Sequence, residues 1–200
     1  MNTSNDSPGD VVLLERAAQG DAESFGLLFD RHHGRIYRHA LRLVQGSAAA
    51  EDIVAMVFLE AWRKRSSITS TGETILPWLL VTANNVASNA RRAERRHALF
   101  LARLPEPEHE PDPAHRVVDQ LENAAHQKDL NAAFNRLGQR DQDILTLCVL
   151  EEMSMSTAGS VLGIPPGTVK SRLSRAKSRL AGMVPHLALY KETNIEGSLR

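Results

Sequence analysis

A run of proline and acidic residues divides this sequence into two parts. The run, PEPEHEPDPAH at positions 105–115, contains four prolines and four acids. Proline has no backbone N–H and clashes with the preceding helical turn, so this composition does not form the interior of a packed element. We therefore expect two domains, 10–98 and 127–183, joined by a linker over 99–126, with a disordered segment at 1–9 and a tail at 184–200.

The composition favours an all-α fold. Of the 200 residues, 42% are hydrophobic, which is enough to bury a core, but only 4% are aromatic. Few aromatics disfavour a β-sandwich or barrel and favour helices rich in Ala and Leu. No segment shows useful strand alternation. We expect two small helical domains joined by the Pro- and acid-rich linker, in a soluble, cytoplasmic protein without membrane insertion, because no apolar run or leader pattern is present.

Helical periodicity organises the first part of the chain. It predicts a helix from Val11 that stops at Gly20, a second helix capped by Asp21 and ending near Gly46, and a third capped by Ser47 with Glu51 and Asp52 in its first turn. A loop at 66–74 precedes a fourth helix, from Pro77 to about His97. The predicted buried faces are Phe25, Leu28, Phe29, Ile36, Ala40 and Leu43; Ile53, Val57, Phe58, Ala61 and Trp62; and Leu79, Ala83, Val86 and Ala90.

The same periodicity predicts several short helices in the second part. One contains Leu130 to Leu137, and another, capped by Asp141, contains Ile144, Leu145, Cys148 and Val149. A third, capped by Ser156, ends at Gly163, and Pro165 and Pro166 then start the last helix. Its predicted buried stripe consists of Val169, Leu173, Ala176, Leu180 and Met183.

The net charge of zero conceals strong segregation of charge. Residues 1–30 carry −5 and residues 105–125 carry −5, whereas residues 91–104 carry +4 and residues 164–183 carry +5. An average over the chain therefore does not exclude binding to nucleic acid. A run of like charge can also be an ordinary solvated helix face, so periodicity has to decide between the two interpretations.

The segment at about 154–175 has the layout of a helix-turn-helix DNA reader. A short helix, a Gly-Ile-Pro turn and a helix with one apolar stripe and only positive charges follow one another. In such readers the second helix enters the major groove, its N-terminal residues reach base edges and its other bases meet phosphates. The alternative is a two-helix corner with a solvated basic face. The residues assigned to DNA are Thr168, Lys170, Ser171, Arg172, Arg175 and Lys177.

The helix from Pro77 carries a second polar face. Asn85, Asn89, Arg92 and Arg96 recur at the same offsets as its apolar face, about 120° around the helix. Amides can bond base edges and guanidinium groups can pair with phosphate or stack on bases. This face could equally bind an acidic protein or only be solvated, and Trp78 is more typical of a core residue than of a stacking platform.

Nothing in the sequence indicates catalysis, a metal or a cofactor. The histidines lack an HExxH or other paired ligand pattern, and His109 and His115 lie in the linker. The single cysteine, Cys148, excludes an internal disulfide and lies on an apolar helical face. No phosphate loop or nucleophile elbow is present. We therefore expect a protein that is not an enzyme and has no catalytic or metal-binding residues and no cofactor.

These segments, taken in order, resemble a known family. Residues 25–63, 76–97 and 162–180, with the proline-rich linker between them, are similar to sigma-70 family RNA polymerase sigma factors of the extracytoplasmic function (ECF) type, which keep only region 2 and region 4. The resemblance implies a transcription initiation factor that joins core polymerase, recognises minus-10 and minus-35 promoter elements and assists melting. It also implies contacts to the β′ coiled coil and the β flap, and an anti-sigma factor as a further partner.

The resemblance assigns roles to individual residues. It gives Thr168, Lys170, Ser171, Arg172 and Arg175 to the minus-35 element. The minus-10 residues that it implies are Asn84, Asn85, Asn89, Arg91, Arg92, Arg95 and Arg96. The polymerase-binding residues that it implies are Glu51, Asp52, Ile53, Val57, Phe58 and Trp62.

The chain departs from the family pattern at two places. Ala55 and Met56 replace a Gln and an acid, which reduces polar contact to polymerase there, and Thr157 to Gly159 replace Glu-Ile-Ala in the first helix of the helix-turn-helix. Gly159 is expected to cost about 1 kcal/mol of helix propensity relative to Ala. Two rival functions remain at this point: a stand-alone helix-turn-helix regulator and a metal-dependent nucleic-acid enzyme.

Overall fold

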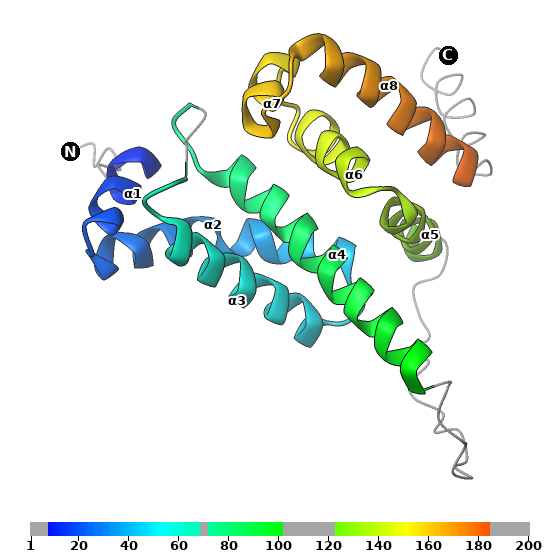
Figure 1. The fold of residues 1–200 in the computed structure, drawn as a ribbon, viewed down its shortest axis with the longest axis horizontal. Coiled ribbons are helices and arrows are strands. Elements are labelled where there is room, and N and C mark those ends of the chain that lie inside the picture. The colour runs from blue at the N-terminus through cyan, green and yellow to red at the C-terminus, as the bar shows by residue number, and fades with distance from the viewer. Residues whose placement is uncertain (1–7, 69–71, 102–122, 185–200) are drawn as a thin grey trace, which may run out of the picture.

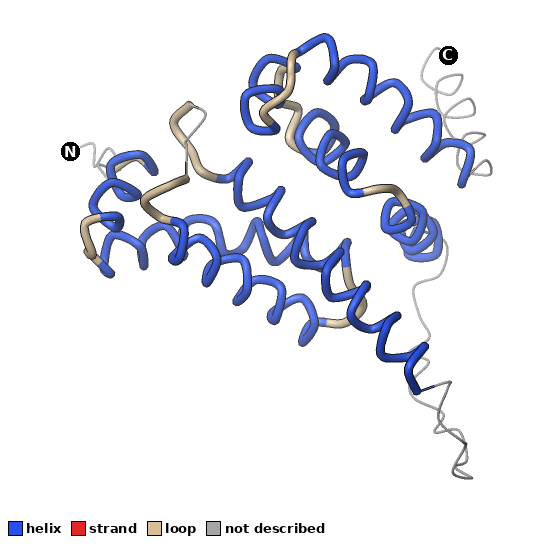
Figure 2. Tube along the Cα trace, viewed as in Figure 1, coloured by secondary structure: helices blue, strands red, loops and turns tan. Residues whose placement is uncertain are grey.

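All regular elements in the described part of the chain are helices, which confirms the all-α prediction (Figure 2). The computed structural model describes residues 8–68, 72–101 and 123–184. The elements are α1 (Asp10–Ala18), α2 (Ala22–Leu43), α3 (Ser47–Lys64), α4 (Leu76–Leu101), α5 (Asn123–Arg136), α6 (Gln139–Leu145), the π-helical turn η1 (Thr146–Leu150), α7 (Met155–Leu162) and α8 (Pro166–Met183).

The helices form two bundles that pack against each other. The first bundle is α1 to α4, and the second is α5 to α8 with η1; α4 lies between α2 and α3 on one side and α6 on the other (Figure 1). Helix α4 continues past the predicted end to Leu101, and α5 begins inside the predicted linker, at Asn123. The proline-rich run, the N-terminal seven residues and most of the predicted tail lie outside the described residues.

The core of the first bundle comes mainly from the predicted apolar faces. Leu28, Ile36, Val57 and Leu79 are fully buried, as periodicity predicts. Phe29 differs from the prediction, because its side chain is 36% exposed and packs at the rim, with its ring 4.7 Å from that of Phe58. Trp78 packs against this core.

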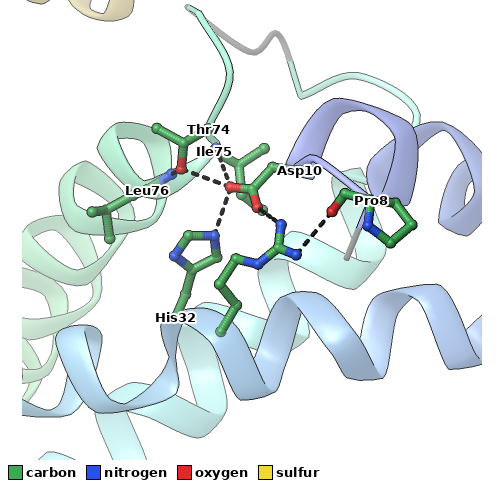
Figure 3. A network of polar contacts seen from close by, with 7 residues as sticks. Pro8, Asp10, His32, Thr74, Ile75 and Leu76 are labelled. Carbon is green, nitrogen blue, oxygen red and sulfur yellow. Dashed lines mark hydrogen bonds and ion pairs between the residues drawn. The ribbon is translucent and has the colours of Figure 1, made fainter. Parts of the chain in front are cut away.

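One buried carboxylate joins three helices of the first bundle. Asp10 accepts hydrogen bonds from Arg31 (2.6 Å), from the Thr74 hydroxyl (2.6 Å) and from the amide of Ile75 (3.0 Å), and lies 2.6 Å from His32 Nε2 (Figure 3). Burial opposes its ionisation, but the hydrogen bonds outweigh burial and hold the pKa of Asp10 well below its usual value. The network therefore fixes α1 and the start of α4 against α2.

The predicted helix caps are only partly correct. Asp21 caps α2, and its carboxylate accepts from the amides of Glu23 (3.0 Å) and Ser24 (3.2 Å). The other three predicted caps are wrong, because each lies inside its helix and an earlier residue takes the cap position. The caps are Gly46 rather than Ser47, Gly138 rather than Asp141, and Ser154 rather than Ser156.

The second bundle is built around the predicted stripe of α8. Val169 and Ala176 are fully buried, and Leu173 packs beside them against α6 and α7. Helix α7 ends at Gly163, whose φ of +64° is the left-handed conformation that glycine adopts without strain. Pro166 then occupies the first turn of α8, where its missing N–H costs nothing.

Gly159 allows α7 to approach the turn before α8 closely. A Cβ built on Gly159 would lie 2.7 Å from the carbonyl oxygen of Ile164. That oxygen belongs to backbone, so the chain itself would have to move. The departure from the family pattern at this position is therefore explained by packing.

We predict that Gly159→Ala destabilises the second bundle by about 1–3 kcal/mol, because overpacking exceeds the gain in helix propensity of about 1 kcal/mol. Gly34→Ala in α2 is the matched control, since a Cβ there meets nothing within 4 Å. Urea unfolding followed by circular dichroism measures both variants. Equal stabilisation by the two substitutions would contradict the close approach at Gly159.

Candidate nucleic-acid interface

Helix α8 presents its basic residues to solvent because its apolar stripe faces the bundle. Lys170, Ser171, Arg175 and Lys177 are exposed, whereas Val169 is buried on the opposite side. The two other predicted DNA residues, Thr168 and Arg172, are half-buried. The predicted basic face thus exists as a continuous surface of one helix, and α7 with the Gly163 turn holds it in place.

The structure adds a basic residue that sequence reasoning missed. Arg140, at the start of α6, lines a cleft of about 560 Å³ with Arg172, Arg175 and Arg179 of α8. Asp141, the acid in this cleft, pairs with Arg179. Residue 140 lies outside both basic blocks of the sequence, so the charge count gave no signal for it. The cleft extends the positive surface of α8 sideways along α6.

The polar face of α4 is exposed over most of its length. Asn85 and Asn89 are exposed, and Arg92, Arg95 and Arg96 continue this face toward the end of the helix. Arg91 is half-buried instead, and donates to the carbonyl oxygen of Leu43 (3.1 Å) and to Asn135 Oδ1 of α5 (2.7 Å).

Asn84 is the exception among the predicted residues of α4. Its side chain is fully buried. Its amide nitrogen donates to Asp143 Oδ1 (2.9 Å) and Thr146 Oγ1 (3.2 Å) of the second bundle, and its oxygen accepts from His39 Nε2 (2.8 Å) of α2. In this arrangement Asn84 connects the two bundles and does not face solvent.

The groups around Asn84 have shifted pKa values. Burial lowers the pKa of His39 to about 4, its hydrogen bond to Asn84 partly opposes this, and the charge of Arg42 lowers it further. Burial raises the pKa of Asp143, against the hydrogen bonds from Asn84 and Gln139. His39 is therefore neutral at pH 7, with the proton on Nε2 that Asn84 requires.

The six predicted polymerase-binding residues lie on two different sides of helix α3. Ile53, Val57 and Phe58 are buried in the core, and Trp62 is half-buried between Phe25 and Arg65. Glu51 and Asp52 are exposed, in the second turn rather than the first. The exposed large apolar residues of α3 are Met56 and Leu59, 52% and 50% exposed. Neither residue belongs to the predicted buried face of α3, but the polymerase-binding residues implied by the resemblance did not include them.

The described residues contain no group of three His, Cys, Asp or Glu side chains that could hold a metal ion. His109 and His115 lie outside the described residues. Cys148 is half-buried rather than a core residue, and burial raises the pKa of its thiol. Within the described ranges no helix is long and apolar enough to cross a membrane.

Comparison with known proteins identifies the family. Residues 28–97 match the family model of sigma-70 region 2, and residues 127–180 match that of sigma-70 region 4. The ECF RNA polymerase sigma factor BldN of Streptomyces coelicolor is 32% identical over 90% of this chain and 68% of its own length. The sigma factor CarQ of Myxococcus xanthus is 28% identical over 88% of this chain and 98% of its own.

Two solved structures share the fold. The sigma factor RpoE of Bartonella quintana, solved with the anti-sigma factor NepR, has a TM-score of 0.54 and 23% identity over 82% of this chain and 98% of its own. CnrH, solved with the cytosolic domain of CnrY, has a TM-score of 0.57 and 21% identity over 88% and 97%.

The two ordered domains and their matches define a sigma factor of the sigma-70 class. The chain belongs to the ECF RNA polymerase sigma factors, which act in transcription initiation. Neither rival considered from the sequence, a stand-alone helix-turn-helix regulator or a metal-dependent enzyme, is favoured by these matches. Members of this family are initiation factors rather than enzymes.

The burial of neutral His39 predicts a pH-dependent stability. The unfolded chain binds a proton at His39 near pH 6.5, whereas the native pKa is about 4. Stability therefore falls as pH drops below about 6.5, by about 1 kcal/mol between pH 7.5 and 5.5. Urea unfolding at the two pH values measures this loss, and the His39→Gln variant should lack that share of it. The same pH dependence in both proteins would contradict a neutral His39.

Proposed function

We propose that this chain joins core RNA polymerase, directs it to promoters with minus-10 and minus-35 elements and assists promoter melting, without itself catalysing a reaction. The observation that supports the proposal best is the pair of outward basic faces on α4 and α8, which lie within the segments matched to regions 2 and 4. A sigma factor needs both faces, because each promoter element is read by a different domain.

Helix α8 is proposed to read the minus-35 element. Its N-terminal residues, from Thr168 to Arg172, can reach base edges in the major groove, and Arg172 can pair bidentately with guanine. Arg175 and Lys177 lie further along the helix, where phosphates pass. Arg140 extends this set, because it lines the same cleft as Arg172 and Arg175.

Helix α4 is proposed to bind the minus-10 element. Side-chain amides of Asn85 and Asn89 can bond the edges of exposed bases, and Arg92, Arg95 and Arg96 can neutralise phosphates or stack. Asn84 and Arg91 can join them only after the second bundle moves away from α4, because both are engaged with it.

The exposed side of α3 is proposed to dock on the β′ coiled coil of core polymerase. Met56 and Leu59 supply apolar area there, and Glu51 and Asp52 supply charge. The buried residues Ile53, Val57 and Phe58 would support this surface from beneath. The family resemblance assigns binding of the polymerase β flap to the second bundle.

Two further proposals rest on the family. The protein acts in the cytoplasm, where polymerase and promoter DNA are found. An anti-sigma factor is its second protein partner, as NepR is for RpoE. Purification of the tagged chain from its native host tests this proposal; recovery of polymerase subunits alone would contradict it.

Promoter-specific initiation tests the proposed function directly. Core polymerase mixed with this chain and genomic DNA of its source should start transcripts at a defined set of sites, which sequencing of transcript 5′ ends maps. Core polymerase alone should start none of them. A chain that binds duplex DNA tightly by itself, and starts no transcripts with core polymerase, would instead be a stand-alone regulator.

We predict that Met56→Glu and Leu59→Glu each weaken binding to core polymerase at least tenfold, because removing a charge from water in an apolar contact costs free energy. The melting temperature should not fall, since both side chains are exposed in the free chain. Leu27→Glu, 45% exposed on α2, is the control. Fluorescence anisotropy of the labelled chain measures the affinity. Equal effects at positions 27, 56 and 59 would rule out α3 as the docking surface.

Removal of a basic side chain that contacts phosphate, on α8 or α6, should lower promoter affinity mainly through the loss of charge. Lys177→Ala and Arg140→Ala should each weaken promoter binding by the holoenzyme and reduce the slope of log affinity against log salt by about 1. Lys64→Ala on α3 removes the same charge away from the basic face and should leave the slope unchanged. An unchanged slope for Arg140→Ala would exclude it from the DNA surface.

A further inference from the structure

The C-terminal end of α4 carries a group of exposed apolar side chains. This end of the helix projects past the neighbouring helices, and every residue from Arg92 to Leu101 is exposed (Figure 1). Leu99 and Phe100 are the two most exposed large apolar residues in the described part of the chain, at 65% and 62%, and Leu101 is 49% exposed. Adjacent apolar residues held in water in this way mark a contact surface, whereas apolar residues scattered singly do not.

Two of these three residues continue the polar face of α4. At about 100° per residue, Leu99 lies within about 40° of Asn85 around the helix and Phe100 within about 60° of it. Leu101 lies about 160° from Asn85, on the opposite side. One exposed surface therefore carries amides, then guanidinium groups and then an apolar pair; in chain order its residues are Asn85, Asn89, Arg92, Arg96, Leu99 and Phe100.

The neighbours of the apolar pair favour nucleic acid as its partner. Arg92 and Arg96 lie one to two turns before it on the same face, and Glu94, the acid of this segment, lies about 180° from Asn85. An apolar protein groove that covered Phe100 would also remove these arginines from water, at a cost in free energy. Nucleic acid offers both groups a partner, because phosphates pair with guanidinium groups and base faces are apolar.

An aromatic ring on such a face distinguishes unpaired bases from paired ones. In a duplex each base is covered on both faces by its neighbours, so a ring can stack on a base only where the stack is interrupted. Stacking on an unpaired base is favourable and depends little on which base it is. A contact that forms only with the melted strand shifts the equilibrium toward melting.

We propose that Phe100, with Leu99 beside it, stacks on an unpaired promoter base at the edge of the melted segment and thereby stabilises strand separation. The inference rests on the proposed role of α4 in minus-10 binding and adds two residues to that face. Arg92 and Arg96 hold the adjacent phosphates and so position the ring. From Asn85 to Phe100 the helix rises about 22 Å, roughly the length of six stacked nucleotides, so the ring contacts a different base from the amides.

Strand binding by the full-length chain tests the contact without polymerase. The probes are a fluorescent random-sequence 20-nucleotide single strand and a duplex of the same length, at low salt. Phe100→Ala should weaken single-strand binding about fivefold or more and leave duplex binding within about twofold, whereas Phe100→Trp should retain single-strand binding. Leu101→Ala is the matched control, because it removes an exposed apolar side chain from the opposite side of the same turn.

Promoter opening by the holoenzyme tests the consequence. At a promoter mapped from transcript 5′ ends and with saturating holoenzyme, permanganate reactivity of unpaired thymines measures the melted fraction. Phe100→Ala should lower this reactivity several-fold and lower transcription from the duplex promoter equally. Transcription from the same promoter with a pre-melted bubble should be unchanged, because strand separation is then already complete. Leu101→Ala should match the unmodified chain on both templates.

The outcomes separate this inference from the proposed function. Equal single-strand affinities for Phe100→Ala and Leu101→Ala would overturn the stacking contact, even where the unmodified chain initiates at promoters. Weaker binding of Phe100→Ala to core polymerase, with unchanged strand affinity, would also overturn it, because the end of α4 would then be a polymerase contact. Failure of the unmodified chain to initiate would contradict the proposed function, whereas selective loss of single-strand binding in Phe100→Ala would still support a base contact.

Discussion

The arrangement of the two bundles depends on one side chain, the amide of Asn84. It joins α2, through His39, to α6 and η1, through Asp143 and Thr146. A buried amide must have its donors and acceptor satisfied, because an unmade hydrogen bond costs more than a made one gains. The second bundle supplies the acceptors that Asn84 needs. The same hydrogen bonds therefore hold the second bundle against α4 and keep Asn84 buried.

Within each bundle, one face of a helix packs in the core and the opposite face carries exposed polar residues. Val169 and Ala176 hold α8 in the core, so Lys170, Arg175 and Lys177 point outward. Two acids of the second bundle form ion pairs with arginines of the chain: Asp141 pairs with Arg179, and Glu151 pairs with Arg35 of the first bundle. The zero net charge of the chain coexists with positive outer faces because the acids are concentrated elsewhere in the sequence, with −5 in residues 1–30 and −5 in residues 105–125.

The helical stripes were predictable from sequence because burial repeats with the period of the helix. This periodicity explains why most of the buried residues of α8 and of α2 were predicted correctly. Helix caps were less predictable, since Ser154 and Ser156 have the same chemistry and only the backbone decides between them. Leu28 and Phe29 illustrate another limit: both were assigned to the buried face of α2, but Leu28 is fully buried and Phe29 is 36% exposed.

The burial of Asn84 could not be predicted from local sequence. Asn84 and Asn85 are adjacent amides on one helix, and their difference comes from Asp143, 59 positions away along the chain. Arg140 was missed for the same reason, because it joins the basic face of α8 only through the packing of α6 against α8. Long-range contacts thus decide which of these polar residues are exposed to solvent.

The most direct test of this account is the separation of the two bundles before and after the chain joins core polymerase. Fluorescent labels on exposed positions, one at Leu27 in α2 and one at Ser178 in α8, report that distance by energy transfer. The account predicts high transfer in the free chain and a large loss of transfer in the holoenzyme. Equal transfer in both states would contradict it, because the surface around Asn84 would then remain covered in the holoenzyme.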